Sequence, residues 1–201
     1  MCAAVGGAWA ARDLGPLPAD GRAASAGPQL TSGTWLPQWR SVGDFTLTDQ
    51  HGAAFTEANL EGEPAIVTFG FTHCPDVCPV TLATLARVTR AAGVPPVRVI
   101  FVTVDPQRDT ASVLGRYVSA FDPAFIALTG PPQTIRALAR RLGVAYERVA
   151  LPGGDYTIDH TAVAFLLDKY GHVDAIFTAP FDAGRLASDL RRAAPFLTVH
   201  D

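Results

Sequence analysis

The sequence has few cysteines, little excess charge and no long hydrophobic run. Three cysteines among 201 residues are too few for a scaffold held together by disulfide bonds, which favours redox or metal chemistry for them. The formal net charge is only -3, and the basic residues are almost all arginines scattered along the chain. This pattern does not resemble a nucleic-acid footprint, so we expect no nucleic-acid partner. No uninterrupted apolar run reaches the ~20 residues that a membrane-spanning helix needs.

The composition predicts one folded domain behind a short N-terminal extension. With 48% hydrophobic residues, a chain of this length can bury a substantial core. Residues 1–34 lack a sustained period, so we interpret them as a disordered tether or as the remnant of a signal or anchor. Cys2 follows Met1 directly, which would suit the lipid-modified first residue of a bacterial lipoprotein; the alternative is an idle thiol in a disordered tail. The folded domain is expected over residues 35–201.

The predictions for this domain centre on the stretch 65–82. Residues 65–71 are apolar, β-branched and aromatic without alternation, which predicts a central strand buried on both faces. Proline fixes its own φ and lacks an N–H group, so Pro79 is best placed at the first helical position, with Cys78 at the helix entrance. Cys74 and Cys78 then lie beside the positive end of the helix, which favours the thiolate forms that attack disulfides or bind metals.

The rest of the chain alternates between strand and helix patterns. Further strands are expected at 97–104 and 125–128, and hairpins at 45–55 and 162–177. Helices are expected after 79, after 109, after 131 and over about 182–196, with Asp109 or Thr110 as the cap of the second. This order predicts an α/β fold, a mixed sheet flanked by helices with an N-terminal β-hairpin extension. Functional loops of such sheets gather beyond the carboxyl ends of the parallel strands, where the cysteine turn is expected.

The spacing of Cys74 and Cys78 permits either redox chemistry or metal binding. Four residues of helix rise by ~6 Å, which is within the Cα separation that a disulfide tolerates. The usual thiol-exchange motif keeps two residues between its cysteines, whereas the wider spacing here favours capture of one ion between both sulfurs. We therefore place metal binding ahead of redox catalysis, without excluding the latter.

A site with two thiolates needs another ligand, and the sequence has five histidines to supply one. His73 adjoins Cys74, but neighbours in an extended segment point in opposite directions. His160 stands in the loop 155–161, immediately before a predicted strand, and this loop can return to the cysteine end of the sheet. We expect His160 to be the third ligand. The other histidines fall in predicted hairpin turns or in the terminal tail, where solvated imidazoles are expected: His51, His172 and His200.

The donor set favours copper over zinc. Soft thiolates prefer Cu(I), and two sulfurs with one imidazole form a trigonal set that also tolerates Cu(II) with an added oxygen. Structural zinc usually takes four ligands. Asp159 is a candidate fourth ligand, but nothing in the sequence requires it. We expect one copper ion per chain, with zinc as the second choice.

Four blocks of the sequence together resemble the SCO/SenC family of copper-binding, thioredoxin-like proteins. The resemblance covers roughly residues 42–197, and its cysteine block is highly specific. The blocks are GDFTLTDQ at 43–50, FGFTHCPDVCP at 69–79, VDPQRDT at 104–110 and IDHT at 158–161. In that family the two cysteines and the later histidine bind copper, which implies Cys74, Cys78 and His160 as the ligands here.

The resemblance implies a membrane-tethered copper chaperone on the periplasmic face of the bacterial inner membrane. Its expected role is to help assemble the binuclear copper centre of cytochrome c oxidase subunit II. The thiol pair of the family can also cycle between dithiol and disulfide, which implies a reductase role on the subunit's cysteines. Other periplasmic copper chaperones or thiol reductases are further expected partners. One departure from the family pattern is the missing anchor helix.

Two alternatives share the same residues. A thiol-disulfide oxidoreductase or thiol peroxidase would use Cys74 and Cys78 without stored metal. Such enzymes commonly place a cis-proline in the loop facing the thiols, whereas the loop before residue 162 has His160 and no proline, which counts against this class. A copper-responsive signalling protein would have the same site and differ only in its partner.

Overall fold

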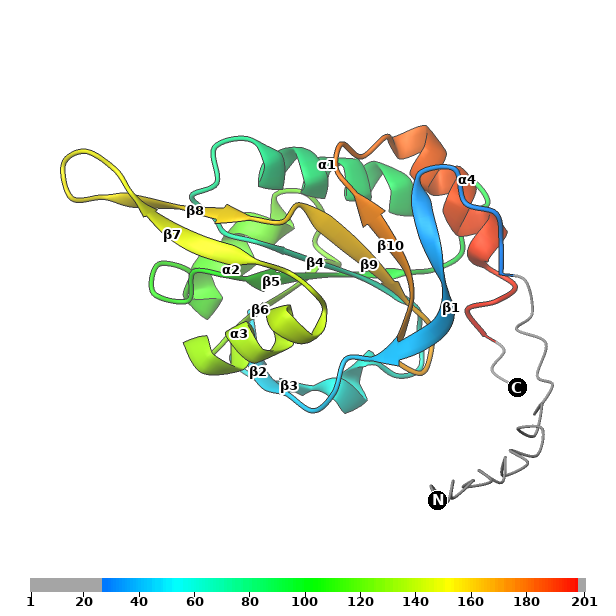
Figure 1. Cartoon of the computed structure of the whole chain (residues 1–201), viewed down its shortest axis with the longest axis horizontal. Helices are drawn as coiled ribbons and strands as arrows, with labels where there is room; N and C mark the ends of the chain where they lie inside the picture. Colours follow the sequence, from blue (N-terminus) through cyan, green and yellow to red (C-terminus); the bar gives the residue numbers. More distant parts are fainter. Residues whose placement is uncertain (1–26, 199–201) are drawn as a thin grey trace, which may run out of the picture.

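The computed structural model describes residues 27–198 (Figure 1). Most of the predicted tether, including Cys2, lies outside the described residues. The described part begins with a segment tied to the body of the protein by Asp189, a fully buried carboxylate of the last helix. Asp189 accepts hydrogen bonds from the backbone N–H groups of Thr31 and Ser32 at 2.8 and 2.7 Å, and from both hydroxyls.

The centre of the fold is a mixed sheet of eight strands in which β4, β5 and β6 run parallel. The parallel strands carry the buried, non-alternating pattern that predicted them, and the antiparallel strands extend the sheet on both sides (Figure 1). In spatial order the strands are β1 (Gly33–Ser41), β10 (His172–Thr178), β9 (Val163–Leu167), β4 (Ala65–Gly70), β5 (Arg98–Thr103), β6 (Ile126–Thr129), β2 (Thr46–Asp49) and β3 (Ala54–Thr56).

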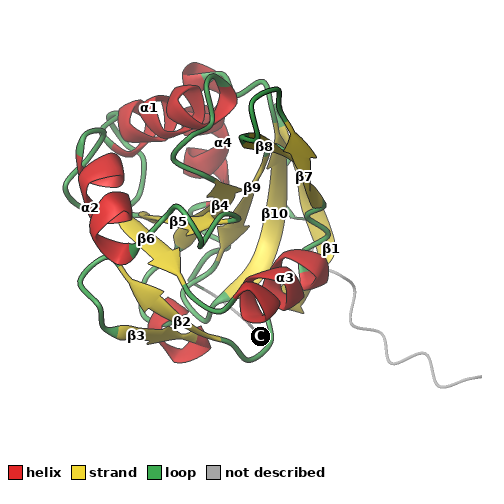
Figure 2. Cartoon of the chain, turned by 90° about the vertical axis from the view of Figure 1, so that its left-hand side faces the viewer, coloured by secondary structure: helices red, strands yellow, loops and turns green. Residues whose placement is uncertain are grey.

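Helices cover both faces of the sheet, as the sequence predicts (Figure 2). One core packs α1, α2 and α4 against one face through residues such as Leu82, Leu114 and Leu190. The other core packs α3 against the opposite face and includes Leu47 and Phe55 from the β2–β3 end of the sheet. The helices are α1 (Val77–Thr89), α2 (Ala111–Ser119), α3 (Pro132–Arg141) and α4 (Ala183–Ala193), with a short 3₁₀ helix, η1 (Glu57–Leu60).

Two elements are absent from the predictions. Strand β1 forms an edge of the sheet, where the sequence predicted no element before the hairpin at 45–55. Strands β7 (Tyr146–Ala150) and β8 (Tyr156–His160) form a separate hairpin that projects from the body of the protein, where a loop was predicted over 155–161 (Figure 1). Strands β1 and β7 are largely exposed, so they lack the hydrophobic periodicity that reveals a buried strand, and β8 buries only Ile158.

Of the two predicted caps of α2, Asp109 and Thr110, the structure has Thr110 as the N-cap. The Thr110 hydroxyl accepts a hydrogen bond from the backbone N–H of Val113, while Asp109 is fully buried and has other partners. The prediction that Asp109 is an alternative cap is therefore wrong. A carboxylate kept out of water needs hydrogen bonds, and those of Asp109 lie at the candidate site.

Candidate metal centre

The cysteine turn lies beyond the carboxyl end of β4, as predicted for a functional loop of this sheet. The backbone N–H of Cys74 donates to the carbonyl of Phe71 at 3.2 Å, which closes the turn. Helix α1 then begins at Val77, two residues before Pro79, so the prediction of Pro79 as the first helical residue is wrong. Cys78 therefore lies within the first helical turn. Its backbone N–H points back to the sulfur of Cys74, at 3.4 Å.

Gly70, the last residue of β4, leaves the space that the Cys78 side chain occupies. A Cβ atom at Gly70 would lie 2.8 Å from Cys78 Sγ and 2.7 Å from the ring of Phe101. Both distances are too short for any real Cβ contact. The absent side chain thus lets the Cys78 thiol lie against the end of the central strand, where it is only 3% exposed.

His160, the last residue of β8, brings its imidazole to this thiol. Its Nε2 atom lies 3.3 Å from Cys78 Sγ, and its Nδ1 atom lies 3.3 Å from the carbonyl oxygen of Thr161. When an ion binds, a proton held on Nδ1 can donate to that carbonyl, which leaves the Nε2 lone pair for the metal. The edge of the ring packs against Phe71, with 6.0 Å between ring centroids. One nitrogen is thus held by the backbone, and the other is free to bind an ion.

Cys74, Cys78 and His160 form one compact group of donors. Their ligand atoms all lie within 4.8 Å of one another, and among residues 27–198 no other set of three or more His, Cys, Asp or Glu side chains meets this condition. Asp159 is exposed and stands outside the group, so the candidate fourth ligand for zinc is not brought in.

The other histidines stay apart from this group. His73 is exposed and its Nδ1 atom contacts the Thr72 hydroxyl at 3.1 Å. His51 is exposed in the turn where it was predicted. His172 opens β10 and stacks on Trp39 at 4.0 Å between centroids, so its prediction as a solvated turn residue is wrong. His200 lies outside the described residues.

The two thiols differ strongly in acidity. A hydrogen bond from the Cys78 side chain, helped by contacts with His160 and with two backbone N–H groups, lowers the pKa of Cys74 to about 4 despite partial burial. The same hydrogen bond, together with burial, raises the pKa of Cys78 far above its ordinary value. The metal-free site therefore holds one thiolate, at the half-buried Cys74, and one buried thiol that must lose its proton when a metal binds.

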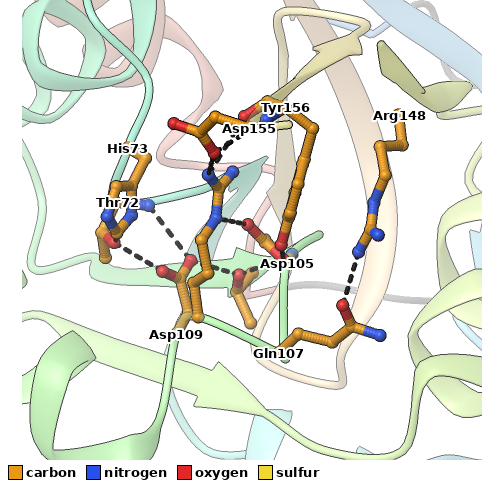
Figure 3. Close-up of polar contacts among 10 residues, drawn as sticks. Thr72, His73, Asp105, Gln107, Asp109, Arg148, Asp155 and Tyr156 are labelled. Atoms are coloured by element: carbon orange, nitrogen blue, oxygen red, sulfur yellow. Dashed lines mark hydrogen bonds and ion pairs between the residues drawn. The ribbon is translucent and has the colours of Figure 1, made fainter. Parts of the chain in front are cut away.

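Asp109 supports the cysteine turn through Thr72 (Figure 3). Its carboxylate accepts hydrogen bonds from the backbone N–H of Thr72 at 3.0 Å, from the Thr72 hydroxyl and from the buried Thr103 hydroxyl of β5. The turn is thereby fixed to the neighbouring strand. Sequence reasoning missed this role because an acid beside a helix start is usually a cap.

The sequence profile of the SCO1/SenC family matches residues 36–195, which is most of the chain. The chain belongs to the SCO1/SenC family. The resemblance drawn from the four sequence blocks is therefore confirmed. The mitochondrial SCO2 homologue of Bos taurus is 36% identical over 167 residues, covering 78% of this SCO1/SenC chain and 61% of the bovine protein. The chain thus matches less than two thirds of the length of this relative.

Solved structures of SCO1/SenC proteins share the fold. The copper-bound ScoI of Arabidopsis thaliana has a TM-score of 0.72 at 34% identity, covering 77% of this chain and 98% of that structure. The copper-bound ScoI of Bradyrhizobium japonicum has a TM-score of 0.68 at 39% identity, covering 75% and 98%. The prediction of a thioredoxin-like mixed sheet flanked by helices is confirmed.

The space left by Gly70 gives a first prediction for this SCO1/SenC chain. Gly70→Ala should lower the free energy of unfolding by roughly 1–3 kcal/mol, because the added methyl group overlaps Cys78 Sγ and the Phe101 ring. Denaturant unfolding measures the change. Gly115→Ala in α2 is the control, since its nearest contact is an ordinary 3.4 Å and a helical alanine should add about 0.5–1 kcal/mol. Equal stability of Gly70→Ala and the parent would contradict the packing argument.

The unequal acidity of the two thiols gives a second prediction. In a reduced Cys2→Ser background, the alkylation rate of Cys74 should already reach its plateau below neutral pH, since its pKa is held at about 4. Cys78→Ala should move that profile to higher pH, because the Cys78 hydrogen bond is the largest cause of the shift. The measurement is alkylation rate against pH, with peptide mapping to assign the modified thiol. A Cys74 profile centred on the ordinary thiol range of about 8.5 would contradict it.

Proposed function

We propose that this chain is a copper chaperone that holds one copper ion between Cys74, Cys78 and His160. The observation that carries the proposal is the convergence of two sulfurs and one imidazole nitrogen within 4.8 Å. Two thiolates with one imidazole form the soft, trigonal donor set that Cu(I) prefers, and an added oxygen would accommodate Cu(II). The copper-bound structures of the Arabidopsis and Bradyrhizobium relatives support the same choice of metal.

Zinc fits the geometry less well than copper. A closed structural zinc site takes four protein ligands, and the compact group among the described residues offers three. A half-buried Cys74 also suits an ion that must be handed on, because a ligand near the surface can exchange with a partner's ligand.

We further propose that the recipient is the binuclear copper centre of cytochrome c oxidase subunit II, as the family resemblance implies. The domain would then act on the periplasmic face of the bacterial inner membrane, tethered through its N-terminal segment, with a lipid on Cys2 as one form of the tether. No helix among residues 27–198 combines the length and apolar character needed to cross a bilayer. The proposed attachment therefore rests on residues outside the described part.

The acidity of the thiol pair supports a second candidate function, reduction of a disulfide. The Cys74 thiolate would attack one sulfur of a partner disulfide and release the other sulfur as a thiolate. Cys78 would then lose its proton and attack Cys74 Sγ, which frees the second partner thiol and leaves a Cys74–Cys78 disulfide. The partner gains the two electrons that the pair loses. The cysteines of the oxidase subunit are candidate substrates, and a periplasmic thiol reductase would restore the pair.

Competition with a Cu(I) chelator tests the chaperone assignment. The reduced chain should bind one equivalent of Cu(I), and Cys74→Ala, Cys78→Ala and His160→Ala should each lose affinity, because removal of one ligand leaves the ion under-coordinated. His73→Ala is the matched control, since this exposed imidazole adjoins Cys74 but lies outside the donor group. Unchanged affinity in His160→Ala would remove His160 from the site. Rapid turnover of a disulfide or peroxide by the metal-free chain would favour the enzymatic alternative.

A further inference from the structure

His160 is carried by a hairpin that lies outside the main sheet. The β7–β8 hairpin is a separate two-stranded sheet that projects from the body (Figure 1). His160 is the last residue of β8, and alternate residues of a strand share one face, so His160 lies on the same face as Ile158 and Tyr156. Ile158 is 7% exposed and joins the core, while Tyr156 packs against the edge of that core. The position of the imidazole therefore depends on what holds this face of β8.

Arg108, in the segment between β5 and α2, holds β8 by three kinds of contact. Its Nη1 atom donates to the carbonyl of Tyr156 at 3.0 Å and to the carboxylate of Asp155 at 3.3 Å. Its guanidinium lies 3.7 Å from the centroid of the Tyr156 ring, a distance typical of a cation–π contact. Its Nε atom is paired with the buried carboxylate of Asp105 at 2.5 Å. The planar guanidinium is thus fixed by Asp105 through its Nε atom and binds the strand through its Nη1 atom.

Tyr156 is held from two further directions (Figure 3). Its hydroxyl donates to Asp105 at 2.9 Å, so one buried carboxylate anchors both the arginine and the tyrosine. The guanidinium of Arg148, on β7, also lies 3.7 Å from the ring centroid and bonds the Gln107 side chain. Arg108 also lies 6.0 Å from the centroid of Phe71, the ring that packs against the His160 imidazole. Arg108 is thus connected to His160 by two routes: along β8 from Tyr156, and through the ring of Phe71.

We propose that Arg108 is a positioning residue. Its contacts with Tyr156 fix β8, and β8 in turn holds the His160 imidazole beside the two thiols. This inference rests on the proposed copper site. Arg108 itself binds no metal. It acts only through the histidine, so its contribution should vanish when the histidine is removed. Supporting contacts that orient a metal ligand are typically worth about 10- to 100-fold in metal affinity.

A double-mutant cycle in Cu(I) affinity tests the proposal. Arg108→Gln should weaken Cu(I) binding by about tenfold or more in the parent chain, and by less than about twofold in the His160→Ala background. Tyr156→Leu should behave in the same way without any change of charge, so it also carries the test should Arg108→Gln not fold. The matched control is Arg90→Gln, because Arg90 donates to a carboxylate and a carbonyl as Arg108 does, but from the C-terminal cap of α1 to Asp122 and Phe121.

The outcomes distinguish a failure of the positioning role of Arg108 from a failure of the proposed copper site. An equal loss of affinity in both backgrounds would overturn the proposal, since it would show an effect of charge or stability that does not pass through His160. No loss in either background would overturn it as well. In the metal-free chain, both substitutions should increase hydrogen exchange at the β8 amides, a readout independent of copper. Failure of the unsubstituted chain to bind Cu(I) would instead overturn the proposed function.

Discussion

The candidate site depends on one long-range contact, in which the His160 imidazole meets a thiol that lies 82 positions earlier in the chain. The cysteine pair is a local structure, set by the end of β4, the turn and the first turn of α1. The histidine has no such local support, because it comes from a hairpin outside the main sheet. The cost of ordering this hairpin must be met by contacts between segments distant in sequence. Those contacts decide whether the chain presents two donors to an ion or three.

A single short segment, residues 105–110, contacts both halves of the site. Asp109 binds Thr72 in the cysteine turn, and Arg108 binds Tyr156 in the histidine hairpin. Asp105 pairs with Arg108 and accepts from the Tyr156 hydroxyl, and its backbone carbonyl accepts from the N–H of Asp109 at 2.9 Å. Buried carboxylates are costly unless their lone pairs are satisfied, and here each is satisfied by a group that belongs to the site's framework. The segment thereby adds to the direct contacts of His160 with Cys78 and Phe71 in aligning the two parts of the site.

The local features of the site could be predicted from the sequence, whereas its supports could not. The buried strand before the cysteines and the turn after it follow from apolar pattern and proline chemistry. The helix start was misplaced by two residues because Pro79 occupies the third helical position, where its missing N–H costs nothing: the first four N–H groups of a helix have no partner within it.

His160 was identified by elimination among five histidines, but as a loop residue rather than as the end of a strand. Within the hairpin only Ile158 is buried, so its hydrophobic pattern is too weak to indicate two strands. The role of Asp109 depends on hydroxyl groups from two other segments, which no local pattern shows.

X-ray absorption of the Cu(I)-loaded chain tests the central claim most directly, because it counts the sulfur and nitrogen atoms around the metal. We expect two sulfur scatterers and one imidazole nitrogen per copper in the parent chain, and loss of the imidazole contribution in His160→Ala with both sulfurs retained. A spectrum with sulfur ligands alone, or one identical in the parent and in His160→Ala, would contradict a site built from Cys74, Cys78 and His160.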